Sequence, residues 1–323
     1  MPSFTRRSFV AGSAALATTP RLLRSQAAKP LYPQRNLPFQ VAVINDEIDA
    51  DFENACHVVA VDFGLKYIEL RALWGKNIST LSDTDIAEAK RILNKYSLAV
   101  SDIASPLFKV SLPGATYKGK VDSFGANDGF AKQNEVLEQS IHMARSFSTT
   151  RIRCFDFLRL ADPKTYLPEI HEQLRKAATR LAKDNLILLL ENEQSCNTAT
   201  GAEAAVTLAA VTNPNFMLNW DPGNAADMGE APYSAGYDLL PKNRIGHCHC
   251  KDVVKGANGK PAWAPVGAGI VDWKGQIQAL IQQKFSATVS LETHWRGAGT
   301  AEASTRESMA GLQKILAEVT GAS

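Results

Sequence analysis

The chain has 323 residues, of which 45% are hydrophobic and 21% are charged, the composition of an ordinary globular protein. The 35 basic and 33 acidic residues leave a formal net charge of +2. This balance gives no electrostatic footprint for nucleic acid or an anionic membrane, so neither partner is expected. The five cysteines form no C-x-x-C pair, which argues against a disulfide framework or a zinc ribbon.

The N-terminus carries the pattern of a targeting segment. Residues 5–10 read Thr-Arg-Arg-Ser-Phe-Val, and a weakly apolar run over 11–19 follows. This pattern resembles a twin-arginine export signal, although a chance Arg-Arg pair in a disordered tail is the alternative. We therefore expect residues 1–35 to be signal peptide and lead, and residues 36–323 to be the folded domain. The resemblance implies export of the folded protein by the twin-arginine machinery, to the periplasm or the medium.

Apolar runs of strand length alternate with helical patterns along the rest of the chain. Strands are predicted at 40–45, 67–73, 98–104, 151–158, 188–191, 217–221, 245–252 and 289–292. Helices are predicted at 49–63, 82–96, 127–147, 167–184, 201–212, 234–241, 272–284 and 301–318. Eight βα units predict a single-domain (β/α)8 TIM barrel, with an open doubly wound sheet as the alternative. The first strand is followed by Asn45-Asp46-Glu47-Ile48 rather than a glycine-rich loop, which argues against dinucleotide binding.

Two long segments between these elements are rich in glycine and proline, residues 105–126 and 253–271. In a barrel, both would lie on the C-terminal face, where active sites form. Loops of this length are usually lids or binding loops, and a disordered surface excursion is the alternative. We expect two lids, with Tyr117 and Trp263 as the aromatic groups that cover a ligand.

Four strands in the C-terminal part of the chain end in a carboxylate or a histidine: Glu191, Asp221, His249 and Glu292. Parallel strands deliver their last residues to one rim of a barrel, so these side chains are expected to meet. Three carboxylates and one imidazole suit Mn²⁺, Mg²⁺ or Co²⁺ better than a thiolate-preferring metal. An internal salt bridge is the alternative for Glu191, and a turn-forming Asp before Pro-Gly is the alternative for Asp221.

Several neighbouring residues are candidates for binding the substrate. His247 shares a strand face with His249 but lies one layer deeper, so a satisfied core histidine is its alternative role. Glu69 is an inward acid near the end of the second strand, for which an ion pair with Arg71 is the alternative. The complete set of expected substrate-binding residues is Glu69, Asn224, His247, Lys251, Trp263 and His294.

Five short motifs carry a family resemblance. They are Leu190-Glu191-Asn192, Asp221-Pro222-Gly223-Asn224, His249-Cys250-Lys251-Asp252, the stretch 266–273 and Leu291-Glu292-Thr293-His294. In this order they resemble the xylose-isomerase-like TIM-barrel family of sugar phosphate isomerases and epimerases, within the AP endonuclease family 2 superfamily, over about residues 38–318. The resemblance implies one divalent metal, Mn²⁺ first and Mg²⁺, Co²⁺ or Zn²⁺ next, bound by Glu191, Asp221, His249 and Glu292.

The resemblance also implies a chemistry. Glu191 and Glu292 would form an acid/base pair that isomerises or epimerises a small sugar or keto-sugar through an enediolate. Asn197, Asn224 and Lys255 depart from the pattern of ketohexose epimerases. A metal-dependent lyase that dehydrates a keto-sugar or cleaves a glycoside is therefore the main alternative. An AP endonuclease and a non-catalytic sugar-binding barrel are further alternatives, and homo-oligomerisation is left open.

Overall fold

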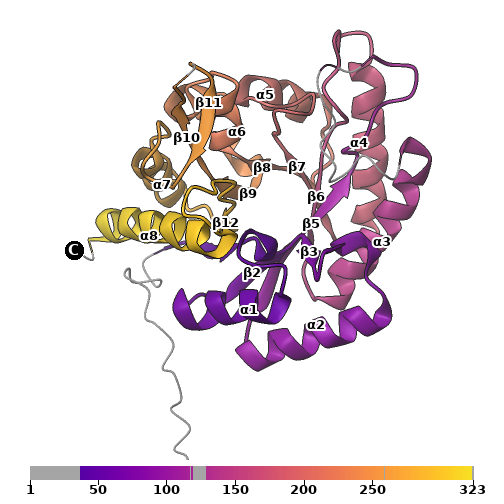
Figure 1. Ribbon diagram of the computed structural model, residues 1–323. Coiled ribbons are helices and arrows are strands. Elements are labelled where there is room, and N and C mark those ends of the chain that lie inside the picture. Colours follow the sequence, from indigo (N-terminus) through magenta and orange to yellow (C-terminus); the bar gives the residue numbers. More distant parts are fainter. Residues whose placement is uncertain (1–36, 117, 119–128, 258, 322–323) are drawn as a thin grey trace, which may run out of the picture.

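The computed structural model describes residues 37–116, 118, 129–257 and 259–321. Eight parallel strands form one sheet in the order β1-β12-β9-β8-β7-β6-β5-β2. Their bounds are β1 Gln40–Val43, β2 Tyr67–Leu70, β5 Ala99–Leu107, β6 Arg151–Cys154, β7 Ile187–Glu191, β8 Phe216–Trp220, β9 Ile245–Cys250 and β12 Thr288–Leu291. A parallel bridge between Ile44 and Glu69 joins the ends of β1 and β2, so the sheet closes into a barrel (Figure 1). The predicted TIM barrel is confirmed.

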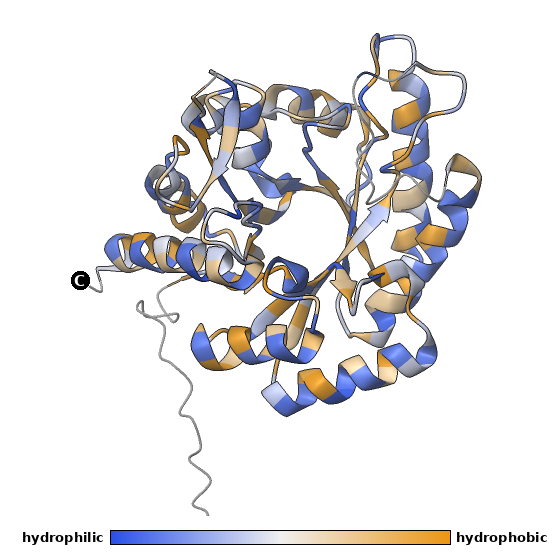
Figure 2. Cartoon of the chain, in the orientation of Figure 1, coloured by the Kyte–Doolittle hydropathy of each residue, from blue (hydrophilic) through white to orange (hydrophobic). Residues whose placement is uncertain are grey.

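Helices surround the barrel on the outside (Figure 1). They are α1 Phe52–His57, α2 Asp83–Tyr96, α3 Gln133–Ser146, α4 Leu167–Ala182, α5 Gly201–Ala210, α6 Pro222–Asp227, α7 Trp273–Gln282 and α8 Ala301–Thr320. Each shows hydrophilic and hydrophobic residues in Figure 2, as expected for helices with one face against a sheet. In α2 the buried residues are Ile86, Ala89, Ile92 and Leu93, four of the positions that recur at helical spacing in the sequence. Over the described part of the chain, no helix is long and apolar enough to cross a bilayer.

The connections differ most from the prediction. Residues 253–271, expected to be a loop, contain most of an antiparallel hairpin, formed by β10 (Asp252–Lys255) and β11 (Pro261–Ala264). A second hairpin, β3 (Ala72–Leu73) with β4 (Lys76–Asn77), follows β2. The turn expected after Asp221 is the start of α6. The helix predicted at 234–241 is wrong in most of its length: residues 234–236 belong to a π-helical turn at Pro232–Gly236, and only residues 237 and 238 are α-helical.

Some predictions fall on residues outside the described ranges. These are the export signal at 1–35, Tyr117, and residues 119–126 of the first expected lid. The strand before that lid, β5, runs on to Leu107, and α3 starts at Gln133 rather than 127.

The two faces of the barrel strands differ in polarity. Leu188, Leu190, Cys248 and Cys250 belong to the apolar core that the strands share with the helices. The residues between them on the same strands, such as His249, do not belong to that core. The barrel interior therefore holds apolar side chains such as Leu189 together with buried charged side chains, which must pair with one another.

Candidate metal centre

Four residues at or beside the carboxyl ends of neighbouring strands meet at the top of the barrel. Glu191 is the last residue of β7, His249 lies in β9, and Asp221 and Glu292 directly follow β8 and β12. One nitrogen or oxygen atom from each lies within 4.8 Å of the others. None of the four is more than 2% exposed. These are the four residues that the sequence predicts to bind a metal.

The atoms face one another around the Nδ1 atom of His249. This nitrogen lies 3.4 Å from Oε1 of Glu191, 3.8 Å from Oδ2 of Asp221 and 3.2 Å from Oε2 of Glu292. Within the described structure, Nδ1 of His249 and Oδ2 of Asp221 are buried and have no hydrogen-bond partner. Oδ2 of Asp221 forms an ion pair with Nζ of Lys251 at 3.0 Å, and a divalent cation among the three carboxylates would give both buried atoms a further partner. One nitrogen and three carboxylates therefore fit a divalent ion such as Mn²⁺, Mg²⁺, Co²⁺ or Zn²⁺.

The electrostatics of the centre favour positive charge. Burial opposes protonation of His249, but the carboxylates of Glu69 and Glu191 raise its pKa well above the usual value. Burial also acts against the ionised form of Glu191, yet His249 and Arg153 lower the pKa of Glu191 to about 2. Burial raises the pKa of Asp221 to about 6. Divalent metals compete with protons for such groups, because the ligands bind metal in their deprotonated forms.

Arginines hold the two glutamates from outside the centre. The Nη1 atom of Arg153, in β6, lies 3.1 Å from Oε2 of Glu191. Arg71, directly after β2, donates from Nη1 to Oε1 of Glu292 at 2.8 Å. In each glutamate, the oxygen bound to arginine is the one that does not face Nδ1 of His249.

Asp221 is fixed through both its backbone and its side chain. Its Oδ1 accepts the backbone N–H of Asn224 at 2.8 Å, which caps the N-terminus of α6. The side chain of Asn192 accepts the N–H of Asp221 at 2.7 Å and donates to its carbonyl at 2.8 Å. Asn224 also places its Nδ2 3.4 Å from Oε1 of Glu191. Asn224, which is predicted to contact substrate, therefore lies directly beside the centre.

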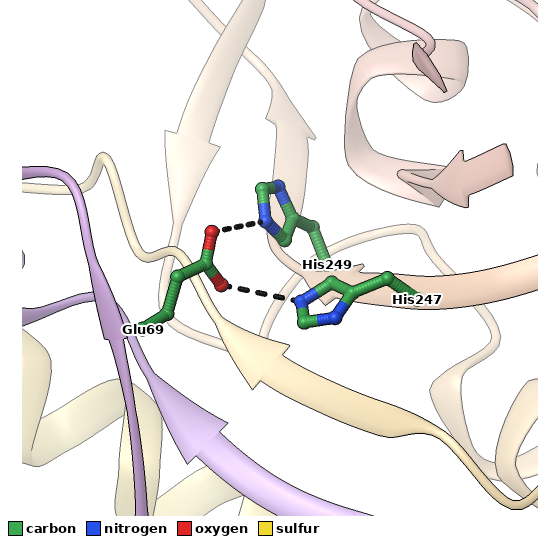
Figure 3. A group of neighbouring side chains, drawn as sticks. All are labelled: Glu69, His247 and His249. Atoms are coloured by element: carbon green, nitrogen blue, oxygen red, sulfur yellow. Dashed lines mark hydrogen bonds and ion pairs between the residues drawn. The ribbon is translucent and has the colours of Figure 1, made fainter. Parts of the chain in front are cut away.

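Glu69 bridges two histidines beneath the centre (Figure 3). Its Oε1 lies 3.1 Å from Nε2 of His249, and its Oε2 lies 3.2 Å from Nε2 of His247. These are hydrogen-bond distances, and a carboxylate on the second nitrogen of a histidine fixes the orientation of its ring. Glu69 and His247 have no exposed surface. Both residues are predicted to contact substrate. The structure places both of them against His249.

The remaining predicted residues line the rim. Lys251 is buried and donates to Oε2 of Glu292 at 2.7 Å, and its Nζ lies 3.0 Å from Oδ2 of Asp221. Trp263, on β11, has its ring centroid 5.0 Å from that ammonium and 5.3 Å from the ring of His294. The side chain of His294 is 28% exposed, and its Nε2 lies 3.3 Å from Oε1 of Glu292. The second predicted lid is thus a hairpin that places its tryptophan at the edge of the centre.

Sequence reasoning missed the arginines. Two arginines at alternate positions, Arg151 and Arg153, in a strand with a buried interior were a usable signal, since a charge there needs a partner. The sequence offers Arg71 as a partner of Glu69, but Arg71 pairs with Asp46, Glu292 and, at 2.7 Å, Glu47. The other oxygen of Glu47 accepts from Arg296 at 2.7 Å, so this acid is better explained as part of an ion-pair network than as a metal ligand.

Comparison with known proteins identifies the fold family. No functionally curated protein matches the chain in sequence. A xylose isomerase-like TIM barrel protein from Mycobacterium smegmatis, solved with magnesium, is 18% identical (90% of this chain, 99% of that chain, TM-score 0.63). A probable 3-DHS dehydratase from Bacillus anthracis is 22% identical (86% and 98%, TM-score 0.62). D-Allulose 3-epimerase from Methylomonas sp., solved with D-allulose, is 18% identical (90% and 99%, TM-score 0.61).

These matches cover nearly the whole barrel. One further structure, a fusion of a xylose isomerase-like TIM barrel with 4-hydroxyphenylpyruvate dioxygenase, is covered over only 43% of its length. A family model for the xylose isomerase-like TIM barrel matches residues 58–315 of the 323, and the chain belongs to this family.

Proposed function

We propose that the protein is a divalent-metal-dependent enzyme that isomerises or epimerises a sugar or keto-sugar. One observation carries the proposal: Glu191, Asp221, His249 and Glu292 converge, with one buried ligand atom of each within 4.8 Å of the others. The D-allulose 3-epimerase and magnesium-bound barrel among the structural relatives support it. We propose Mn²⁺ as the native ion because three carboxylates and one imidazole are hard to intermediate ligands.

A bound divalent ion would polarise the substrate carbonyl and stabilise the negative charge that develops on its oxygen. In the proposed reaction, one of Glu191 and Glu292 removes the proton from the carbon beside the carbonyl, which leaves an enediolate. The other glutamate returns the proton on the opposite face in an epimerisation, or to the neighbouring carbon in an isomerisation. Lys251 places an ammonium beside Glu292, and Trp263 and His294 offer a face and an edge for the sugar.

A lyase is the second candidate, because the same proton removal can be followed by loss of a β-substituent. The probable dehydratase among the structural relatives favours it. Asn197 favours it as well, since it replaces a substrate-contacting glutamate of ketohexose epimerases. Its side chain donates instead to the backbone carbonyls of Asp156 and Phe157, at 2.8 and 3.2 Å.

We propose a small neutral sugar or glycoside as the substrate. The three cations closest to the centre, Arg71, Arg153 and Lys251, face carboxylates of the protein, which disfavours a phosphate ester. We also propose that residues 1–35 direct folded export to the periplasm and that residues 36–323 form the active domain.

Metal analysis tests the proposal. The mature protein, residues 28–323, is purified together with Glu191→Gln and Glu292→Gln, and each is loaded with Mn²⁺. We expect about one ion per chain in the wild type and a sharp loss in both variants, since each removes a charged ligand. Asp156→Asn is the matched control, because Asp156 is a buried carboxylate that contacts Thr198 instead of the centre.

Retention of a full metal load in both glutamine variants would contradict the ligand assignment. A folded wild-type protein that takes up no metal from Mn²⁺, Co²⁺, Mg²⁺ or Zn²⁺ would contradict the proposed function. If the wild type binds the metal, exchange of carbon-bound hydrogen with D₂O across a panel of keto-sugars would identify the substrate. Release of a leaving group would distinguish a lyase from an isomerase.

A further inference from the structure

We infer that Arg71 and Arg153 are positioning residues that leave each glutamate a single oxygen for the metal, so that the rest of the coordination sphere stays open to a substrate that chelates through two oxygens. The inference rests on the metal site proposed above. It assigns a role to two residues outside the predicted ligand set.

Arg153 is fixed on several sides and cannot turn away from Glu191. It is 2% exposed, and its Nη1 lies 3.1 Å from Oε2 of Glu191. Its Nε and Nη2 donate to the carbonyl oxygens of Ser105 and Ala104, at 3.3 and 3.1 Å. The guanidinium also lies 4.9 Å from the ring centroid of Phe155. A planar group with donors in a fixed fork can make these contacts at the same time, whereas a lysine cannot.

Arg71 holds Glu292 in the same manner from the opposite side. Its Nη1 donates to Oε1 of Glu292 at 2.8 Å, its Nη2 to Oε1 of Glu47 at 2.7 Å and its Nε to Oδ1 of Asp46 at 3.0 Å. Its backbone N–H donates to the side chain of Asn45 at 2.9 Å, which fixes the position from which the side chain extends.

The two arginines thus bind one oxygen of each glutamate and leave the other. The remaining oxygens, Oε1 of Glu191 and Oε2 of Glu292, lie 3.4 and 3.2 Å from Nδ1 of His249. Oε1 of Glu292 is held by a charge-assisted hydrogen bond from Arg71. Oε2 of Glu191 is held by an ion pair with Arg153 at 3.1 Å that lacks hydrogen-bond geometry. Both contacts keep the paired oxygen from turning onto the metal. Without the arginine, both oxygens of the glutamate can bind the ion and occupy a position that a substrate oxygen would need.

The test uses Co²⁺, whose visible absorption responds to the number and arrangement of its ligands. Co²⁺ affinity and spectrum are measured for the wild type, Arg153→Met and Arg71→Met, together with the spectral change on adding acetohydroxamate, a two-oxygen chelator. We expect the methionine variants to show a changed Co²⁺ affinity, a shifted spectrum and a smaller response to acetohydroxamate, because the second glutamate oxygen occupies a coordination position. Arg153→Lys and Arg71→Lys should lie between.

Arg151→Met is the matched control. Arg151 precedes Arg153 by two residues on β6, and its Nε donates to the carbonyl of Gly246 at 3.2 Å, one layer below the centre. This variant should keep the wild-type affinity and spectrum, because it removes a barrel arginine without releasing either glutamate.

The outcomes separate this inference from the proposed function. A wild-type protein that does not bind Co²⁺ would remove the metal site itself. A wild-type protein that binds Co²⁺ while both methionine variants match its affinity, spectrum and acetohydroxamate response would overturn the role of the arginines. Where a methionine variant does not fold, wild-type behaviour of the two lysine variants in all three measurements would overturn it instead.

Discussion

Asp221 can be both a helix cap and a metal ligand, two roles that the sequence presents as alternatives. One carboxylate oxygen caps α6 through Asn224, as expected of an Asp before Pro222 at the first helical position. The other oxygen faces His249. The turn-forming role and the proposed ligand role therefore use different atoms of the same side chain. Asn192, which binds the backbone of Asp221, explains why this geometry is rigid.

A second buried acid gives a prediction about pH. Asp156 is 1% exposed, and its two oxygens accept the backbone N–H and the hydroxyl of Thr198, at 3.0 and 2.6 Å. Burial raises the pKa of Asp156 to about 6 from the ordinary value of 3.8. Since the folded state then holds a proton that the unfolded state has released, the stability contributed by this group falls as pH rises from about 4 to about 6.

Asp156→Asn removes this proton and keeps the shape of the side chain. The wild type should lose about 3 kcal/mol of unfolding free energy relative to the variant between about pH 4 and about pH 7. Urea denaturation of both proteins across that range measures the difference. A difference that stays constant with pH would show that Asp156 titrates alike in the folded and unfolded states.

At the scale of elements, the packing of α8 depends on one glycine. A Cβ atom on Gly311 would lie 1.9 Å from the carbonyl oxygen of Val266, in the segment that follows β11. Alanine gains about 1 kcal/mol over glycine in a helix interior, but this contact forces the backbone apart, at a cost of about 1–3 kcal/mol. We expect Gly311→Ala to lower the unfolding free energy, measured by urea denaturation.

The neighbouring position provides the control for Gly311→Ala. Ala310 is exposed on the same helix, so Ala310→Gly should cost only the difference in helix propensity, about 1 kcal/mol. A Gly311→Ala variant as stable as the wild type, or more stable, would mean that α8 can move away from Val266 without loss.

The elements that the sequence predicted are those with a repeating pattern. All eight barrel strands lie where apolar runs predicted them, because parallel strands are buried on both faces. The α6 helix was missed because it has six residues, too few for a helical period to be visible. The β10–β11 hairpin was missed because glycines and prolines surround its short strands, and such a composition also fits a loop.

For the whole molecule, the barrel divides into two halves with different tasks. The neighbouring strands β7, β8, β9 and β12 carry the four proposed ligands. Glu191, Asp221 and Glu292 each end an apolar run of the sequence, whereas His249 lies inside β9. The other half, β1, β2, β5 and β6, carries Glu69, Arg71 and Arg153, which hold the ligands together with Asn192 and Lys251 of the first half. The partners of the two arginines lie on other strands, 38 positions away for Arg153 and Glu191 and 221 for Arg71 and Glu292, so the sequence can indicate a buried charge but not its partner.

This division means that the centre forms only after nearly all of the chain has been made. Strand β12 pairs with β1 on one side and β9 on the other, and Glu292 directly follows it. Closure of the barrel and completion of the ligand set are therefore the same event. All five cysteines are buried as free thiols, so folding needs no oxidising compartment. A protein of this kind suits export after folding, which is what the pair Arg6-Arg7 predicts.

Replacing both arginines tests this route for the full chain. Arg6→Lys/Arg7→Lys should remain in the cytoplasm, still folded and with the same metal content as the wild type, because the barrel sequence is unchanged. The wild type should reach the periplasm in a bacterial host with the twin-arginine system and stay inside a host that lacks it, as measured by cell fractionation and immunoblotting. Arg21→Lys/Arg24→Lys is the control, because it makes the same exchange outside the pair and should leave export intact. Equal export of both double variants would show that the pair is not read as a signal, and the barrel would then have to find its metal and its substrate in another compartment.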